Sequence, residues 1–361
     1  MEGGRKRKVV IDCDPGIDDA YAVYAALSCR ELEVVGITTV FGNVTTPEAT
    51  RNALHLLEVA GLAKGEVPVV QGALGPLASP GAPHRVAGFV HGSDGLGDTD
   101  VPIVADAALL RQAAAASHEG RDAAAFLAEL ARAWPGQLHV VCLASLTNLA
   151  LCLRRDPEVA PLLASVAFLG GAIFVNGNVS PAAEANVLGD PEAADEVFRA
   201  AGLRRLTVIP LDASLRCPLA EHHIETLRAI GGRVGPYLHG ISQFYVAFHE
   251  RTYGRRIVYP HDALVVLALL AEGEGLFQFA AGAVRVCVDP GLMRGLTVMD
   301  ARGRTWHGEG ARPWNLFDGH GDTTRVALGC NGDALVALLM RVLAGDGGVA
   351  YRGLKALATT S

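Results

Sequence analysis

The sequence predicts an α/β fold in which an open, mostly parallel sheet is covered by helices on both faces and extended by additional C-terminal strands. Three observations predict it. The first half of the chain alternates short apolar runs with helical patterns, and the same rhythm returns in the middle of the chain. From residue 283 onward, the apolar residues alternate as in exposed or edge strands.

The predicted elements follow one another in a regular order. Strands are expected at residues 9–11 and 32–40, and helices at 17–28 and 50–60, where Gly61 closes the second helix. Strands at 138–143, 166–169 and 206–211 alternate with helices at 146–153 and 191–201, and a helix at 262–271 follows. The strands 283–288, 296–299 and 324–328 and a terminal helix at 334–343 complete the chain. This succession indicates a Rossmann-like sheet.

Two long stretches, 72–100 and 251–260, fit neither pattern and are rich in Gly, Pro, His, Arg and Tyr. Long loops inside a compact domain are usually functional or disordered. We expect them to form the rims or lids of a pocket.

Composition limits the possible functions. With 361 residues, half of them hydrophobic, and no linker, the chain is expected to fold as a single domain over 1–361, with residues 1–7 disordered. A net charge of −7, with one short basic run at 5–8, argues against nucleic acid and favours a small-molecule partner.

Cysteine usage and hydropathy indicate the compartment. The seven cysteines are scattered and lack Cys-x-x-Cys pairing, so the sequence indicates neither a disulfide framework nor a zinc site, and a reducing compartment fits best. No apolar signal core and no membrane-length apolar run is present. We expect a cytoplasmic protein that does not associate with membranes.

Four carboxylates stand at the junction between the first predicted strand and the first predicted helix: Asp12, Asp14, Asp18 and Asp19. Pro15 suits the first helical position, which would make Asp14 the N-cap and place Asp18 and Asp19 in the first turn, so one or two acids are explained by the helix alone. Four acids repel one another and need a counter-charge. Hard oxygen ligands without nearby His or Cys indicate calcium or magnesium.

Polar residues also follow the other predicted strands. Asn43 follows the second strand, and a later loop carries Asn178, Glu184 and Asn186. Each Asn alone is an ordinary turn residue, but amides and carboxylates together suit a hold on sugar hydroxyls. The dipeptide His261-Asp262 opens an apolar helix, where Asp262 could be an N-cap and His261 an ordinary loop histidine. If the sheet is parallel, these strand ends share one crevice.

These motifs together resemble the inosine-uridine preferring nucleoside hydrolase family, and residues 91–97 and 181–186 resemble its plant uridine and purine ribohydrolase branch. The resemblance runs from about Lys8 to about Arg325. At Ala185 the chain departs from many relatives, which carry an aromatic residue there. The residues that carry the resemblance are Asp12-Cys13-Asp14-Pro15-Gly16-Ile17-Asp18-Asp19-Ala20, Gly42-Asn43, Ala144-Ser145-Leu146-Thr147-Asn148, Glu184-Ala185-Asn186 and His261-Asp262-Ala263.

The resemblance implies a calcium-dependent enzyme that hydrolyses the N-glycosidic bond of ribonucleosides such as inosine, xanthosine and uridine. It also implies a dimer or a tetramer, of which we expect the homodimer. It implies that Ca²⁺ is held by Asp14, Asp19, the main-chain carbonyl of Leu143 and Asp262, with Asp14 also the general base. By the same resemblance, Asn43 supports the metal-binding carboxylates, and the ribose is bound by Asp18, Asn178, Glu184, Asn186 and Asp262.

The residues that face the base are less constrained. We expect His261 to supply the leaving-group proton, although it could instead pack against the base or position Asp262. The rim residues are candidates for stacking on the base or hydrogen bonding to it, and each could equally be an ordinary surface residue: His91, Tyr245, His249 and Tyr253.

Two rival interpretations remain open. A haloacid-dehalogenase-type phosphatase also begins with a strand that ends in Asp-x-Asp, but it needs a core lysine, and the only lysines are Lys6, Lys8, Lys64 and Lys355. The second rival interpretation is a catalytically inactive relative that only binds nucleosides. The complete acidic set, Asp14 included, favours activity over binding alone.

Overall fold

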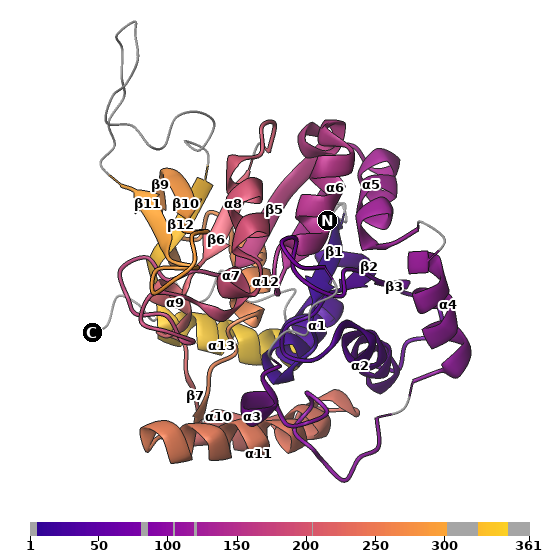
Figure 1. Cartoon of the computed structure of the whole chain (residues 1–361). Helices are drawn as coiled ribbons and strands as arrows, with labels where there is room; N and C mark the ends of the chain where they lie inside the picture. Colours follow the sequence, from indigo (N-terminus) through magenta and orange to yellow (C-terminus); the bar gives the residue numbers. More distant parts are fainter. Residues whose placement is uncertain are drawn as a thin grey trace, which may run out of the picture.

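An eight-stranded sheet forms the centre of the computed structural model, which describes residues 6–80, 86–103, 105–118, 121–203, 205–301 and 324–345. Its strand order is β3-β2-β1-β4-β5-β6-β12-β9, and every pair is parallel except β12 with β9 (Figure 1). The strands are β1 (Arg7–Cys13), β2 (Leu32–Thr39), β3 (Val69–Gln71), β4 (Leu138–Cys142), β5 (Leu163–Leu169), β6 (Leu206–Ile209), β9 (Phe277–Ala281) and β12 (Thr324–Cys330).

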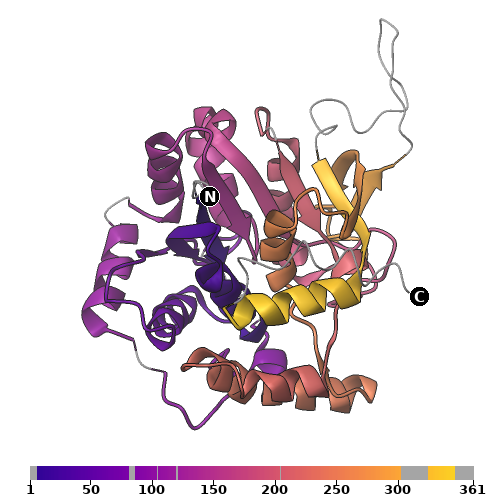
Figure 2. The same cartoon turned by 180° about the vertical axis from the view of Figure 1, so that it is seen from behind.

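Side chains on β1 alternate between two apolar cores. Val9, Ile11 and Cys13 belong to one core, and Val10 belongs to the other. Helices contribute to the first core from α1 (Ile17–Ser28), α2 (Thr46–Val59), α10 (Glu221–Leu227), α11 (Val234–Tyr253), α12 (Ala263–Leu270) and α13 (Gly332–Leu343). The second core is built with α5 (Ala123–Ala133), α6 (Thr147–Arg155), η1 (Pro157–Leu162) and α8 (Pro191–Arg199). The predicted covering of both faces is therefore confirmed, and α13 lies in front when the molecule is seen from behind (Figure 2).

The chain reverses its direction of travel across the sheet between β1 and β4. It proceeds outward from β1 through β2 to β3 and then returns to the other side of β1 as β4. The loops that leave β1 and β4 therefore diverge, and such a switch point is where open parallel sheets bind ligands. Helix α11 lies across the bottom of the view beside α3 (Gly88–His91) (Figure 1).

Smaller elements complete the fold. The strands β10 (Ala283–Val286) and β11 (Thr297–Asp300) form a separate antiparallel pair, as do β7 (Leu219–Ala220) and β8 (Ile257–Val258). The remaining helices are α4 (Ala107–His118), α7 (Ala185–Gly189) and α9 (Leu211–Ser214).

Several predicted details are wrong. The strand expected at 324–328 is not an edge strand, because the unpredicted β9 pairs with it and takes the edge. The segment 251–260 is not one loop, since α11 runs to Tyr253 and β8 follows. Residues 1–7 are expected to be disordered, yet Arg7 belongs to β1 and pairs with Leu32 of β2, and 1–5 lie outside the described residues. Among the described helices, none combines the length and apolar character needed to cross a membrane.

Candidate functional site

A cavity of about 490 Å³ opens at the carboxyl ends of the parallel strands. Most of the residues predicted for the site line it, although they come from segments up to 244 residues apart, from Asp18 to Asp262. Those that line it are Asp18, Asn43, His91, Leu143, Asn178, Glu184, Asn186, His249, Tyr253, His261 and Asp262. Asp14 and Asp19 are buried but do not line the cavity.

The first helix begins later than the sequence predicts. Gly16, rather than Asp14, is the N-cap of α1. Asp19 is the third helical residue, and its Oδ2 atom accepts a hydrogen bond from the Gly16 amide at 2.8 Å. A Cβ at Gly16 would lie 2.7 Å from Asn43 Nδ2 and 2.8 Å from His91 Nδ1, so a larger residue there would displace one of these side chains. The close approach of these two side chains therefore requires glycine at the helix start.

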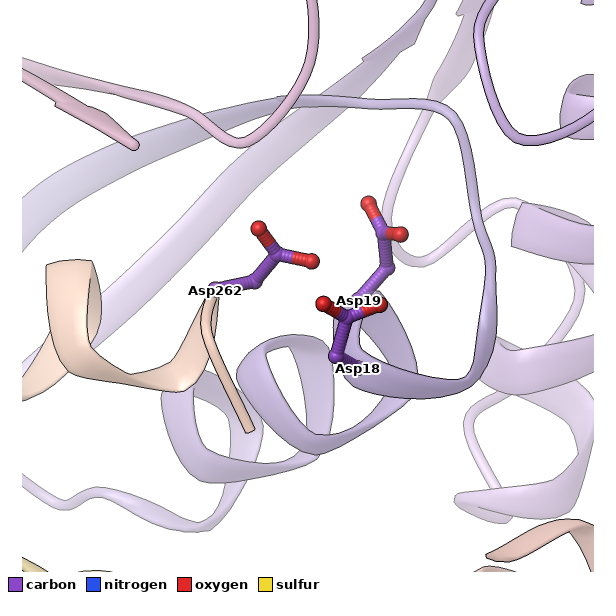
Figure 3. Close-up of side chains that lie close together, drawn as sticks. All are labelled: Asp18, Asp19 and Asp262. Carbon is purple, nitrogen blue, oxygen red and sulfur yellow. The ribbon is translucent and has the colours of Figure 1, made fainter. Parts of the chain in front are cut away.

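Three buried carboxylates meet where α1 and α12 begin. Asp18 and Asp19, on consecutive positions of α1, offer oxygens within 4.8 Å of one another and of an Asp262 oxygen (Figure 3). One oxygen of each, Oδ1, accepts no hydrogen bond from the described residues. Asp262 stands at the N-cap position of α12 but caps no backbone amide. The capping explanation for Asp262 is therefore wrong, and its side chain turns toward the other two acids instead (Figure 3).

Burial raises the pKa of each of these acids, and repulsion between the carboxylates adds to the shift at Asp14, Asp18 and Asp262. Burial raises the pKa of Asp14 and Asp18 well above its usual value, and the charge of Asp19 raises both further. Burial likewise raises the pKa of Asp262, to which the charges of Asp18, Asp19 and Asp14 add. A set of buried carboxylates with unfilled oxygens and no compensating cation is costly, so this arrangement fits a bound cation.

His91 does not supply the missing positive charge. Its Nδ1 atom lies 3.8 Å from Asp18 Oδ1, but the same atom accepts a hydrogen bond from the Ile17 amide at 3.1 Å. A nitrogen that accepts carries no proton, and burial lowers the pKa of His91 to about 3. The ring is neutral and helps to hold the start of α1.

Asp14 is fixed by the turn after β2. Its Oδ2 atom accepts a hydrogen bond from the Asn43 amide at 2.5 Å, while the Asn43 side chain donates to Asp19 Oδ2 at 3.0 Å. A Cβ at Gly42 would lie 1.9 Å from Asp14 Oδ2, so this approach exists only because residue 42 is glycine. Asn43 therefore links two of the carboxylates.

The loop before α7 is rigidly braced. Glu184 caps α7 by accepting from the Asn186 and Val187 amides, and it also accepts from the Gly171 amide at 2.9 Å. Asn178 Oδ1 accepts from the Ala185 amide at 2.9 Å. These bonds hold the loop in a position where its side chains line the cavity.

Asn186 joins the ends of two strands. Its side-chain amide donates to the carbonyl of Leu143, after β4, at 2.8 Å and to the carbonyl of Leu169, at the end of β5, at 3.0 Å. The Leu143 carbonyl is therefore held at the cavity by a predicted site residue.

An aromatic wall closes the other side of the cavity. We use this name for Tyr245, Phe248, His249, Tyr253 and Tyr259, which line the cavity from α11 and the segment after it. The His249 ring contacts those of Tyr245 and Tyr259 at centroid distances of 4.5 and 5.3 Å, and Tyr253 is 60 % exposed at the rim. The wall offers ring faces on which a planar base could stack.

His261 lies between this wall and the acids. The Tyr259 ring stacks on it at 5.3 Å, and its Nδ1 atom is 2.8 Å from Ser214 Oγ. Burial, followed by the charge of His249, lowers the pKa of His261 to about 3. The expectation that His261 supplies the leaving-group proton assumes a ring that is readily protonated at neutral pH. Burial lowers the pKa of His261 and so favours the neutral ring.

Sequence reasoning missed Phe89, Phe248, Tyr259 and Ser214. Tyr259 lies inside the segment 251–260, whose richness in Tyr and Arg predicts a rim, so that signal was present. Ser214 follows β6 in the short helix α9 and carried no motif of its own.

Comparison with known proteins agrees with this geometry. Residues 9–337 match the model of the inosine-uridine preferring nucleoside hydrolase family. The chain belongs to this family. This nucleoside hydrolase is 40 % identical to uridine nucleosidase 1 of Arabidopsis thaliana over 311 residues, 86 % of each chain. It is 31 % identical to the inosine-uridine preferring nucleoside hydrolase of Leishmania major, covering 82 % of this chain and 88 % of that one.

Solved structures of other nucleoside hydrolases share the fold. A plant nucleoside hydrolase superposes with a TM-score of 0.82 at 36 % identity, over 94 % of this chain and 99 % of that chain. A purine-preferring ribonucleoside hydrolase from Gardnerella vaginalis gives a TM-score of 0.79 at 27 % identity, over 95 % and 100 %. The protein is thus a nucleoside N-ribohydrolase with the family's α/β architecture.

Proposed function

We propose that this nucleoside hydrolase cleaves uridine, inosine and xanthosine to ribose and free base in a calcium-dependent reaction. The observation that carries the proposal is the set of buried, partly unsatisfied carboxylates beside a nucleoside-sized cavity. The names of its relatives, which include a uridine nucleosidase and an inosine-uridine preferring enzyme, support the choice of bases.

The donor set fits calcium better than a transition metal, since the cluster offers carboxylate oxygens and no thiolate or imidazole. We assign Asp14, Asp19, Asp262 and the Leu143 carbonyl as its ligands. Asp14 and Asp19 are buried and do not line the cavity, whereas Asp262 and Leu143 line it together with Asp18, so the ion would lie at the boundary between the buried acids and the substrate. Asp18 is then free to meet the substrate although its oxygens lie close to those of Asp19 and Asp262.

We assign Asp14 as the general base. A bound calcium ion would acidify and orient a water molecule at this site. Asp14 is buried next to the other proposed ligands, so its carboxylate would face a water molecule held at this site and could take its proton. The Asn43 amide fixes the direction of this carboxylate.

The ribose would contact the carboxylates at the starts of α1 and α12 and the loop before α7. We assign Asp18, Asp262, Asn178, Glu184 and Asn186 to its hydroxyls. A 2′-deoxyriboside would leave buried polar groups without a partner, so efficiency on deoxyribosides should fall by roughly 100-fold or more.

The base would lie against the aromatic wall with His261 at its edge. Because the His261 ring is neutral, we assign it the role of hydrogen-bond donor to the leaving base rather than that of an imidazolium acid. We expect both purines and pyrimidines to be accepted, because the small side chain of Ala185 lies at the cavity together with the aromatic wall.

The experiment is an assay of base and ribose release by the purified protein. Uridine, inosine, xanthosine and 2′-deoxyuridine are compared by kcat/KM, with Asp14→Asn as the matched inactive variant. We expect release from the three ribosides and a loss of at least 100-fold in Asp14→Asn, about 2.7 kcal/mol of barrier, at unchanged circular dichroism.

The rival functions give different outcomes. Equal kcat/KM for uridine and 2′-deoxyuridine would contradict the proposal that buried polar groups bind the ribose hydroxyls. Binding of nucleosides without ribose release would indicate an inactive binding protein, and phosphate release from a phosphomonoester would indicate a phosphatase.

A further inference from the structure

Two thiols from distant parts of the chain meet behind α9, outside the substrate cavity. Cys217, three residues after α9 ends, and Cys330, the last residue of β12, have their Sγ atoms 3.5 Å apart across a sequence separation of 113 residues. Cys217 is fully buried, and Cys330 is partly exposed. Neither residue lines the cavity. All seven cysteines lie in the described residues, and none of the other five makes a sulfur–sulfur contact that the structure shows.

The backbone holds the two thiols in place. A Cβ at Gly332 would lie 1.9 Å from the Arg216 carbonyl oxygen, so the segments that carry Cys217 and Cys330 approach as closely as backbones can. The Cys217 amide donates to the Ser214 carbonyl at 3.2 Å. Cys330 Sγ also lies 3.3 Å from the carbonyl oxygen of Ala213 in α9. The sulfur contact is therefore imposed by the packing of β12 against α9.

The chemistry of the pair is asymmetric. The hydrogen bond from Cys217 lowers the pKa of the Cys330 thiol, and Cys330 is also the more exposed of the two. Cys330 is accordingly the sulfur that can act as a nucleophile toward a reagent in solution, and Cys217 is placed to resolve the product.

We propose that Cys217 and Cys330 form a reversible disulfide with a low-molecular-weight disulfide oxidant, and that this bond slows turnover through α9. The Cys330 thiolate attacks a sulfur of glutathione disulfide and releases one glutathione thiolate, which takes up a proton. The Cys217 thiol then gives up its proton, and its sulfur attacks the Cys330 sulfur of the mixed disulfide. The second glutathione leaves as a thiolate, which takes up that proton. Two protein thiols are oxidised, and one glutathione disulfide is reduced to two glutathione molecules.

The effect on turnover follows from what α9 carries. Ser214, its last residue, contacts His261 Nδ1 at 2.8 Å. A disulfide brings the sulfurs from 3.5 Å to about 2.05 Å and pulls the segment after α9 toward β12. That movement loosens the contact between Ser214 and His261 and lowers kcat.

The test treats the purified full-length protein with glutathione disulfide and counts thiols in denaturant. We expect the count to fall from seven to five, and a peptide pair joined through Cys217 and Cys330, 2 Da lighter than its reduced parts, to appear on mass spectrometry. The oxidised protein should show a kcat at least threefold lower and a Tm higher by about 5 °C, both reversed by dithiothreitol.

Three variants make the test specific. Cys217→Ser and Cys330→Ser should each abolish the linked peptide and the response of kcat to oxidation, so that either suffices if the other folds poorly. Cys287→Ser, which removes a partly exposed cysteine without a sulfur neighbour, should respond as the wild type does. Seven thiols after treatment, a bond between other cysteines, or an unchanged kcat in the linked protein would overturn the proposal. Because the thiol count is independent of the substrate, its result is separate from that of the nucleoside assay.

Discussion

The imidazole of His261 is positioned by the hydroxyl of Ser214, which lies 2.8 Å from its Nδ1 atom. Ser214 is fully buried, and the neutral ring needs one nitrogen to donate and the other to accept. If the hydroxyl donates to Nδ1, the proton of the ring stands on Nε2. In that tautomer Nε2 is the nitrogen that would donate to a leaving base.

Removing this hydroxyl should weaken catalysis through His261 alone. We expect Ser214→Ala to lower kcat about tenfold with little change in KM, because the ring loses its fixed tautomer but the ribose contacts remain. The measurement is a double-mutant cycle with His261→Ala. The effect of Ser214→Ala should vanish in that background, and two fully additive effects would show that Ser214 acts elsewhere.

Removal of the proposed calcium should destabilise the protein. After treatment with a chelator, the buried carboxylates lose their counter-charge, so Tm should fall, and Ca²⁺ should restore it more effectively than Mg²⁺. At a free Ca²⁺ concentration of about 100 times the Kd, the gain is about 2.7 kcal/mol.

Asp262→Asn should abolish most of this response, whereas Asp289→Asn, at an exposed position outside the cavity, should retain it. Differential scanning fluorimetry over a Ca²⁺ titration makes the comparison. A response that survives in Asp262→Asn at full strength would place the ion elsewhere.

Adding one methyl group at Gly42 should disable the enzyme without unfolding it. The new Cβ would lie 1.9 Å from Asp14 Oδ2 and must displace that carboxylate, so we expect Gly42→Ala to lower kcat/KM at least 100-fold. Gly240→Ala is the matched control, because Gly240 lies within α11 and a methyl group added there would meet no atom within 4 Å. Control activity should equal that of the wild type, with a slight gain in stability.

A histidine remote from the cavity should contribute to acid sensitivity. Burial lowers the pKa of His139 from 6.5 to about 4, and its Nδ1 atom lies 2.8 Å from Ser165 Oγ. The unfolded chain therefore binds this proton more readily than the folded protein. The stability that neutral His139 contributes is complete above pH 6.5 and is lost as the pH falls toward 4.

His139→Gln should therefore show a shallower fall of Tm between pH 6.5 and 4 than the wild type. Thermal melts in buffers of equal ionic strength check this, with the exposed His222 changed to Gln as a control. Parallel curves for wild type and His139→Gln would refute the assignment.

The sheet and its acids were predictable because their signals are local. The run of apolar residues that ends in Asp12 and Asp14, followed by a helical pattern, predicts a strand, a carboxylate cluster and a helix from neighbouring residues alone. Strand ends in a parallel sheet then share one edge, which brings Asp14, Asn43 and Leu143 together.

The rest depends on contacts between distant segments. β9 pairs with β12 across the sheet edge, and no periodicity in 277–281 predicts that partner. Gly16 is the N-cap, and Asp14 accepts from the Asn43 amide instead, a long-range bond that the local capping preference does not contain. The contact of Ser214 with His261 likewise spans 47 residues.

The aromatic wall comes from one continuous stretch of chain, α11 and the residues up to Tyr259, whereas the acids come from the starts of α1 and α12. Substitutions can therefore change the aromatic wall without changing the acids. If the base lies against this wall as proposed, related enzymes can diverge in the base they accept through substitutions in a single segment while the acids stay unchanged. An inhibitor that mimics only the sugar should act across such enzymes, and one that extends over the wall should distinguish between them.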